Sequence, residues 1–294
     1  MSALPDDIVS FRRYLKRRNY AANTVRSYLN DLAHFRRVVD KPVREVSAQD
    51  VERFIEQQQE RGLAASTINR RLVAVARLYT YLRQTEDPEL VVPVRPQLHY
   101  LKQPDPLPRG LKREEVQRLF AVIDDARDRA IFSLMLRCGL RVREVTRLEM
   151  PDVDLAGQQL LIRQSKNGRD RLVYVAPDAL QNLEAYLTQR GGAECAQVFV
   201  VPGGRGRGQG ISVRGIQKRL EHYVAQAGLE DVTCHRLRHT FAGQLLDNGA
   251  ELTTVQALLG HRQMRTTQRY ARVSNPKVRE DYFRGMAQVL DSQT

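Results

Sequence analysis

The chain has 294 residues, of which 42% are hydrophobic and 28% charged, a composition typical of globular domains that excludes a disordered chain. Its net charge of +13 favours a polyanionic partner such as nucleic acid, although ribosomal and membrane-surface proteins share this trait. No apolar run is long enough to span a bilayer, no secretory signal is expected, and three widely spaced cysteines favour free thiols in a reducing cytoplasm.

Residues 1–92 are expected to form an all-helical domain, because apolar side chains recur at helical spacing in four segments. Asn23 is predicted to cap the second helix, and Ser66 to open the fourth. Ser47 and Asp50 have the spacing of a capping box, in which each side chain bonds the backbone N–H of the other residue, so the third helix is predicted to begin there.

Arginine pairs lie between the apolar stripes of these helices. A solvated charged face would explain any single pair. Four pairs in one small helical bundle favour a surface that follows phosphates, so this domain is predicted to clamp DNA. The expected DNA-binding residues are Arg12, Arg13, Arg17, Arg18, Arg36, Arg37, Arg70 and Arg71.

Five prolines fall within residues 91–110, where they interrupt regular structure and favour an extended connector. A linker is therefore predicted over residues 93–110. The chain then continues into a second domain over residues 111–294.

The second domain is predicted to combine helices with a small sheet, so the chain as a whole is mainly α with a small β-sheet, an α+β fold. Residues 159–163 and 171–175 have the composition of strands, and Asn167-Gly168 between them is a hairpin turn signal. Residues 198–201 are a candidate third strand. One helix is expected to start at Glu114, and three more are expected over residues 127–137, 178–190 and 212–228. Further helices are expected from residue 235 to the C-terminus.

The first motif whose residues could take part in a reaction is Gly139-Leu140-Arg141, at the end of a predicted helix. Gly139 suits the left-handed conformation with which many helices end. Glu144, one turn later, can orient the guanidinium of Arg141 by a charge-assisted hydrogen bond. Taken alone, the triplet is explained as well by a surface arginine after a helix cap.

The second motif region covers residues 235–270 and holds three of the six histidines. Its imidazole, guanidinium and phenol groups can together bind a phosphodiester, stabilise charge on it and attack it. Tyr270 has arginines on both sides in sequence, which suits a site that faces phosphate rather than a core. The polar residues of the region include His235, Arg238, His239, His261, Arg262, Arg265, Arg269 and Tyr270, and Arg272 lies two residues after Tyr270.

These motifs, in this order, resemble those of the tyrosine recombinase or phage-integrase family, and in particular its Xer-like members. The resemblance covers nearly the whole chain. It implies an all-helical N-terminal core-binding (SAM-like) domain, followed by a tyrosine-recombinase catalytic domain. It also implies site-specific cleavage and rejoining of DNA through a 3′-phosphotyrosyl intermediate, with neither a metal nor another cofactor.

The resemblance assigns roles to individual residues. Tyr270, nine residues after His261, is the expected nucleophile. Arg141, Arg238 and His261 are expected to contact the non-bridging oxygens of the phosphate. His235 is the expected acid/base partner close to the nucleophile.

Lys166, at the predicted hairpin tip, matches the lysine with which the family protonates the leaving 5′ oxygen. The chain contains 40 arginines and only 7 lysines, and Lys166 is the only lysine between Lys112 and Lys218. A lysine is informative there because arginine hardly ever gives up its proton.

Two other interpretations of the histidine motif are disfavoured. His235 and His239 have the spacing of a zinc-protease ligand pair, but Arg236 stands where that motif requires glutamate. His239 is instead expected to be structural. A Cys234–His235 nucleophile pair is also unfavourable, because adjacent side chains point to different sides.

The resemblance implies a double-stranded DNA recombination site as partner, bound by a homotetramer or heterotetramer on two sites. An amphipathic tail helix after Asn275 is expected to dock on a neighbouring protomer, with packing on its own domain as the alternative. Two rival functions are a type IB topoisomerase-like enzyme and a DNA-binding protein whose catalytic set has decayed. The intact set argues against the second. The residues leave open the target sequence, the need for a second recombinase, and whether the outcome is resolution or integration.

Overall fold

A computed structural model divides the chain into two compact units, Met1–Asp105 and Pro106–Thr294. It describes residues 6–103, 110–163, 170–190, 194–260 and 276–291. Within these ranges, no helix is both long and apolar enough to cross a bilayer.

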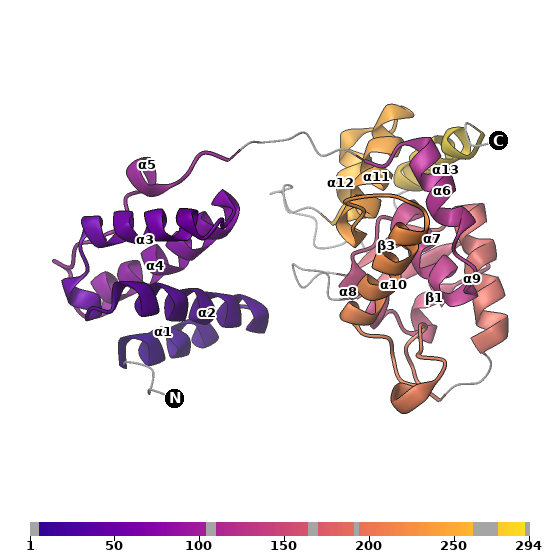
Figure 1. Cartoon of the computed structure of the whole chain (residues 1–294). Helices are drawn as coiled ribbons and strands as arrows, with labels where there is room; N and C mark the ends of the chain where they lie inside the picture. Colours follow the sequence, from indigo (N-terminus) through magenta and orange to yellow (C-terminus); the bar gives the residue numbers. More distant parts are fainter. Residues whose placement is uncertain (1–5, 104–109, 164–169, 191–193, 261–275, 292–294) are drawn as a thin grey trace. The chain divides into compact units, whose positions relative to one another are not determined.

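The N-terminal unit is built of helices, as predicted (Figure 1). Its core is formed by one apolar face of each long helix, and α4 contacts the other three. Aromatic rings fill much of this core, with Phe35 and Phe54 packed edge to face. The helices are α1 (Asp6–Arg17), α2 (Ala22–Val39), α3 (Ala48–Glu60), α4 (Ala65–Thr85) and the short α5 (Pro96–His99), with a 3-10 turn over Val43–Glu45.

The helix starts in this unit test three of the predictions. The capping box of Ser47 and Asp50 is present, so that prediction is confirmed. The predicted starts at Asn23 and Ser66 are wrong by one or two residues, since α2 and α4 follow Ala21 and Ala64, which make no side-chain cap bond. Asn23 and Ser66 lie instead within the first turns of α2 and α4.

The first part of the predicted linker differs from the extended connector expected there. Val94 is buried in the N-terminal core, and α5 begins with Pro96. Asn69 of α4 donates to the Leu101 carbonyl at 2.8 Å and accepts from the Leu101 N–H at 2.9 Å. Residues 93–101 consequently pack on the N-terminal unit. Proline at the start of α5 is compatible with a helix because no intrahelical N–H is needed there.

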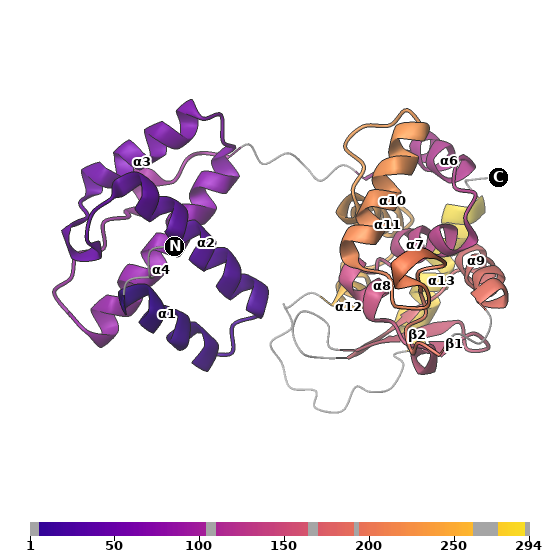
Figure 2. The ribbon, with the colours of Figure 1, turned by 60° about the horizontal axis from the view of Figure 1, so that its bottom comes forward.

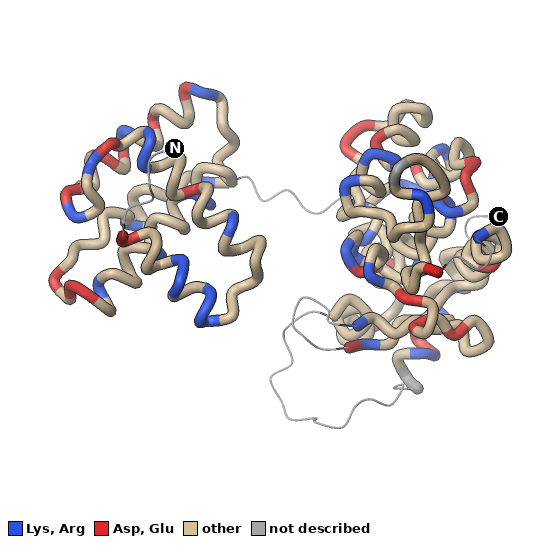
Figure 3. The backbone as a smooth tube through the Cα atoms, turned by 90° about the horizontal axis from the view of Figure 1, so that it is seen from below, with Lys and Arg blue, Asp and Glu red and all other residues tan. Residues whose placement is uncertain are grey.

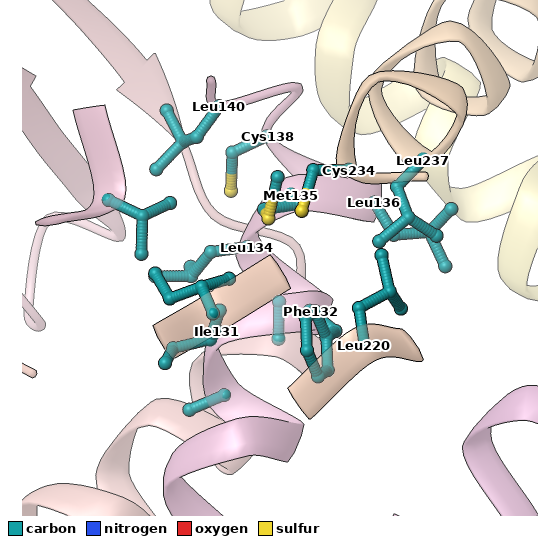
Figure 4. Packing of buried hydrophobic residues seen from close by; sticks show 14 of the residues in the cluster. Ile131, Phe132, Leu134, Met135, Leu136, Cys138, Leu140, Leu220, Cys234 and Leu237 are labelled. Carbon is teal, nitrogen blue, oxygen red and sulfur yellow. The ribbon is translucent and has the colours of Figure 1, made fainter. Parts of the chain in front are cut away.

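The second unit packs its helices around α7 (Ala126–Arg137), which contacts α9 and α11 (Figure 1). Figure 4 shows the apolar side chains of α7 and its neighbours, including the thiols of Cys138 and Cys234. Burial raises the pKa of Cys234 to about 11, so this thiol is an apolar packing group. The other helices are α6 (Arg113–Ala121), α8 (Val142–Arg147), α9 (Pro177–Arg190), α10 (Val213–Gln226), α11 (Cys234–Asp247), α12 (Leu252–Leu259) and α13 (Pro276–Asp291).

The sheet of this unit is small and antiparallel, with the order β1-β2-β3. Figure 2 shows β1 and β2 at one edge of the unit. Its strands are β1 (Val153–Asp154), β2 (Gln159–Ile162) and β3 (Arg171–Tyr174). The predicted hairpin strands are confirmed, with Ile162 opposite Arg171 at the end next to the connecting segment. The third strand predicted over residues 198–201 is wrong. Val200 forms only an isolated bridge with Gly210, and β1 takes the third place in the sheet.

The tail helix α13 packs on α11 and α12 of its own unit. Tyr282, Met286 and Val289 are buried there, and the Tyr282 hydroxyl donates to the Arg137 carbonyl at 3.0 Å. Thr254 of α12 also donates to the Asp281 carboxylate at 2.9 Å. In the single chain, α13 therefore packs on its own domain, which is the alternative named above, and docking on a neighbouring protomer stays a prediction.

Candidate active site

Gly139 forms the turn that carries the chain from α7 into α8. Its φ is +64°, in the left-handed region. A Cβ atom at this position would lie 2.4 Å from Phe241 Cδ1 and 2.9 Å from Leu259 Cδ2. The close approach of α11 and α12 thus requires glycine here as much as the turn does. Two residues later the chain reaches Arg141, which directly precedes α8.

Arg141 is held by Glu144, as the charge-assisted bond expected between them requires. The Glu144 carboxylate accepts the backbone N–H of Arg141 at 2.8 Å and its Nη1 at 2.9 Å. The Arg141 side chain is 27% exposed, whereas that of Glu144 is 7% exposed. A buried carboxylate therefore aims a guanidinium that still reaches solvent.

Arg171 is a site residue that the sequence prediction missed. It opens β3, and its Nη1 and Nη2 donate to the two carboxylate oxygens of Glu144 at 2.9 and 2.8 Å. Its Nε donates to the Leu258 carbonyl in the last turn of α12 at 2.8 Å. The one available signal is its place at the start of a strand, directly after the segment that holds Lys166.

Arg238 reaches the same carboxylate from α11. It donates from Nη1 to the Gly139 carbonyl at 2.5 Å and from Nη2 to the Leu259 carbonyl at 2.7 Å. Its Nη1 also lies 3.7 Å from Glu144 Oε2. Together with Arg171, it binds carbonyls at the C-terminal end of α12, where helix carbonyls lack partners and the helix dipole is negative.

Charge at this junction is unbalanced. Among the residues that the structure describes at this junction, the guanidiniums of Arg141, Arg171 and Arg238 face the carboxylate of Glu144, which leaves two positive charges (three minus one). Burial raises the pKa of Glu144, but the hydrogen bonds and charges of Arg171 and Arg141 outweigh it and lower the pKa to about 2. Burial, followed by the charge of Arg141, lowers the pKa of Arg238. A phosphate would compensate this surplus charge.

His235 lies in the first turn of α11, after the Thr233 side chain that caps the helix. Its Nε2 lies 2.9 Å from Nε2 of His239, so one imidazole donates and the other accepts. Burial, then the charges of His239, Arg238 and Arg141, lower the pKa of His235. His239 thus contacts the candidate acid/base directly, whereas the sequence predicted a purely structural role for it.

The remaining predicted site residues, Lys166, His261 and Tyr270, lie outside the described residues. Arg171 follows Lys166 by five positions in the sequence, and Gly260 directly precedes His261. The structure brings together Arg141, Glu144 and Arg238, with His235 within the range of their charges.

The predicted DNA-binding arginines are not equivalent to one another. Arg70 is bonded to the buried carboxylate of Asp31 and, at 2.7 Å, to Ser27, and Arg71 is bonded to Gln58. Figure 3 shows Lys and Arg segments interspersed with Asp and Glu around this unit. The exposed members are Arg12, Arg13, Arg17, Arg18, Arg37 and Arg70, and Arg36 is half-buried.

A basic hollow of about 520 Å³ between α1 and α2 was not predicted from the sequence. Arg12 and Lys16 of α1 line it, together with Arg26 of α2. Lys16 and Arg26 do not belong to the arginine pairs named above. The packing of α1 on α2 places Arg26 at the same hollow as Arg12 and Lys16.

Comparison with known proteins decides the family. The profile of the phage integrase family matches residues 109–276, and that of its N-terminal SAM-like domain matches residues 8–86. The chain belongs to the phage integrase family. It is 32% identical to the tyrosine recombinase XerA of Thermococcus onnurineus, over 95% of each chain. It is 31% identical to the tyrosine recombinase XerC of Staphylococcus haemolyticus, over 94% of this chain and 95% of that one.

Solved structures show the same fold at lower identity. A lambda integrase tetramer bound to a Holliday junction has a TM-score of 0.72 at 16% identity, and covers 91% of this chain and 79% of that one. A lambda integrase dimer bound to a core site has a TM-score of 0.71 at 16% identity, and covers 90% of this chain and 98% of that one. The predicted fold class and the Xer-like resemblance are confirmed. The chain is a tyrosine-type site-specific recombinase, an enzyme that cleaves and rejoins DNA.

Proposed function

We propose that this recombinase cuts DNA by attack of the Tyr270 phenol oxygen on a phosphodiester. The new phosphorus–oxygen bond is a 3′-phosphotyrosyl ester, and the bond that breaks releases a 5′-hydroxyl. A 5′-hydroxyl from a second strand then attacks the ester, re-forms a phosphodiester and frees Tyr270. The observation that carries the proposal is the surplus of two positive charges around Glu144, which suits a phosphate.

Arg141 and Arg238 are the proposed ligands of the non-bridging oxygens. Glu144 and the carbonyls of Gly139 and Leu259 fix the two guanidiniums before DNA arrives, so no reorganisation is needed during the reaction. Removing one such donor typically slows a reaction by roughly 100-fold or more. We expect that loss in Arg141→Ala and Arg238→Ala, measured as the rate of covalent adduct formation. An unchanged rate in either variant would remove that arginine from this role.

Proton transfer is assigned to lysine and histidine side chains. Lys166 is proposed to protonate the leaving 5′ oxygen, and His261 to donate to the phosphate oxygens. The lowered pKa of His235 supports its role as a base at neutral pH, since the imidazole is then mostly uncharged.

The N-terminal unit is proposed to hold DNA through the exposed arginines at the C-terminal end of α1, Arg17 and the following Arg18. Replacing Arg17 and Arg18 by alanine should reduce the slope of log affinity against log salt by about 0.9 for each phosphate that the variant no longer neutralises. Arg70→Ala should instead destabilise the unit, because Asp31 would stay buried without its counter-ion. An unchanged salt slope in the double variant would exclude phosphate binding by these two arginines.

The functional assembly is proposed to be a tetramer on two double-stranded DNA sites, in the cytoplasm. The lambda integrase tetramer on a Holliday junction supports this assembly, and the free thiols support a reducing compartment. Docking of α13 on a neighbour would require Tyr282 and Met286 to leave their own domain, which would break the Tyr282–Arg137 hydrogen bond.

Exchange of DNA partners tests this function against that of a relaxing enzyme. A supercoiled plasmid with two copies of the chain's own site, each flanked by a different marker, is incubated with the protein. We expect recombinant products in which the markers have changed partners. Relaxed plasmid without recombinants would favour a topoisomerase-like activity. Unchanged plasmid without covalent adduct would indicate a decayed site.

A further inference from the structure

Arg171 has its guanidinium occupied on three sides by the protein itself. Nη1 and Nη2 bind the two oxygens of Glu144, and Nε binds the Leu258 carbonyl. Its side chain is 10% exposed, against 27% for Arg141. Exposure does not separate Arg171 from Arg238, whose side chain is 5% exposed, but the acceptors do. A guanidinium whose three nitrogens all donate to protein acceptors is suited to orienting other groups rather than to binding a phosphate.

Arg171 donates to three acceptor atoms on two residues, Glu144 and Leu258, which belong to segments distant in sequence. Glu144 lies 27 positions from Arg171, and Leu258 lies 87 positions from it. Arg171 is itself fixed in the sheet opposite Ile162. Gly260 is so near that a Cβ atom there would lie 3.3 Å from Arg171 Cδ. The residue thus connects the start of β3, the carboxylate that aims Arg141 and the last turn of α12.

We propose that Arg171 is a positioning residue for DNA cleavage, which acts by holding Glu144, and through it Arg141, in register with the end of α12. This inference rests on the proposed function, because it assigns Arg171 to the same reaction. In this proposal, Arg171 itself contacts no reacting atom. Its effect passes through the Glu144 carboxylate, to which Arg141 and Arg238 are also bound or adjacent.

The chemistry requires arginine rather than lysine. The planar guanidinium donates in fixed directions to both oxygens of one carboxylate and to a third acceptor, whereas an ammonium is a single point donor. Arg171→Lys keeps the positive charge but removes the paired hydrogen bonds to the Glu144 carboxylate. A misplacement of about 1 Å in a catalytic group can slow a reaction by roughly 100-fold. We therefore expect adduct formation in Arg171→Lys to slow by roughly 10- to 100-fold at saturating DNA, with DNA affinity little changed.

Arg127 provides a matched control in the same unit. Its side chain is also 10% exposed, it donates from Nε and Nη2 to the Asp128 carboxylate at 3.0 and 2.7 Å, and its Nη1 donates to the Val200 carbonyl at 3.3 Å. Arg127→Lys removes comparable paired hydrogen bonds, to the Asp128 carboxylate, outside the proposed site. It should lose a similar amount of stability and keep the wild-type rate of adduct formation.

The experiment uses the full chain and two readouts. The first is the rate of covalent adduct formation on a nicked suicide substrate. The second is hydrogen exchange of the Arg141 N–H, which bonds Glu144 in the structure and needs no DNA. We expect Arg171→Lys to slow the first and accelerate the second, without global unfolding, while Arg127→Lys changes neither.

A double-mutant cycle with Glu144→Gln shows whether Arg171 acts through Glu144. The pair Arg171→Gln and Glu144→Gln should together be no slower than the slower single variant. The inference would be overturned if the rate losses of the two single variants multiplied in the double variant. An unchanged rate of adduct formation in Arg171→Lys, or an unchanged exchange rate of its Arg141 N–H, would also overturn it. A wild-type chain that forms no adduct would overturn the proposed function instead, and the exchange readout would still decide whether Arg171 holds Glu144 and Arg141.

Discussion

Glu144 binds Arg141 twice, through the backbone N–H at 2.8 Å and through the guanidinium at 2.9 Å. One carboxylate therefore caps α8, a helix of only six residues, and aims the side chain that precedes it. Because Arg171 binds the same carboxylate, helix capping, strand placement and guanidinium orientation depend on a single buried group.

Glu144→Gln should reduce the amount by which the free energy of unfolding falls as the pH is lowered. The pKa of Glu144 is lowered from 4.5 to about 2, so its charge stabilises the fold above pH 4.5, and that stability is lost as the pH falls through about 2. Urea unfolding of the second unit at several pH values below 4.5 measures the slope. The variant should be less stable at pH 7 and show a smaller loss toward acid. A slope equal to that of wild type would contradict the assignment.

Gly139→Ala should destabilise the second unit more than Gly249→Ala. Both glycines have positive φ, +64° and +78°, so alanine is strained at either position by roughly 1–2 kcal/mol. Only at Gly139 would the new Cβ also meet Phe241, 2.4 Å away, whereas no atom lies within 4 Å at Gly249. The clash should add about 1–3 kcal/mol to the loss measured by urea unfolding. Equal losses would show that the clash with Phe241 is unimportant.

Local signals in the sequence predicted most helices and part of the site. Gly139 ends α7 as expected, and the Ser47 capping box starts α3, because both depend on neighbouring residues alone. Glu144 lies one turn after Arg141, so their bond could also be predicted. The third strand predicted over residues 198–201 does not join the sheet, because Phe199 and Val201 form backbone hydrogen bonds with residues 208–211 instead. β composition alone does not show which segment a strand will pair with.

Long-range contacts explain what the sequence could not show. Arg171 resembles any arginine at a strand start until Glu144 and Leu258 are seen beside it. Arg70 belongs to a pair like the others, and only the fold sets it against Asp31. The apolar stripe of α13 predicts that something covers the helix, but not that its own domain does.

His239→Gln should raise the pKa of His235. The charge of His239 is one of the causes that lower this pKa, after burial, and Arg238 and Arg141 remain in the variant. Titration of the His235 imidazole by NMR measures the change, and the acid limb of the cleavage rate should move to higher pH with it. His222→Gln, on α10, is the control and should leave His235 unchanged. A lower pKa in His239→Gln would refute this coupling.

Lys166→Ala should be rescued by a substrate with a 5′-phosphorothiolate at the cleavage point. Sulfur leaves without protonation, so the general acid is no longer needed. The cleavage rate on the ordinary and the sulfur substrate is compared for both proteins. Lys218→Ala, an exposed lysine of α10, should behave like wild type on both. Equal defects of Lys166→Ala on the two substrates would remove Lys166 from the role of general acid.

Covalent capture on a nicked suicide substrate tests the identity of the nucleophile most directly. The nick lets the short fragment next to the cleavage point diffuse away, so the protein–DNA ester accumulates and can be counted on a denaturing gel. Wild type should form the ester, and Tyr270→Phe, which lacks only the phenol oxygen, should form none. An adduct of normal yield with Tyr270→Phe, or none with wild type on its own site, would contradict attack by Tyr270.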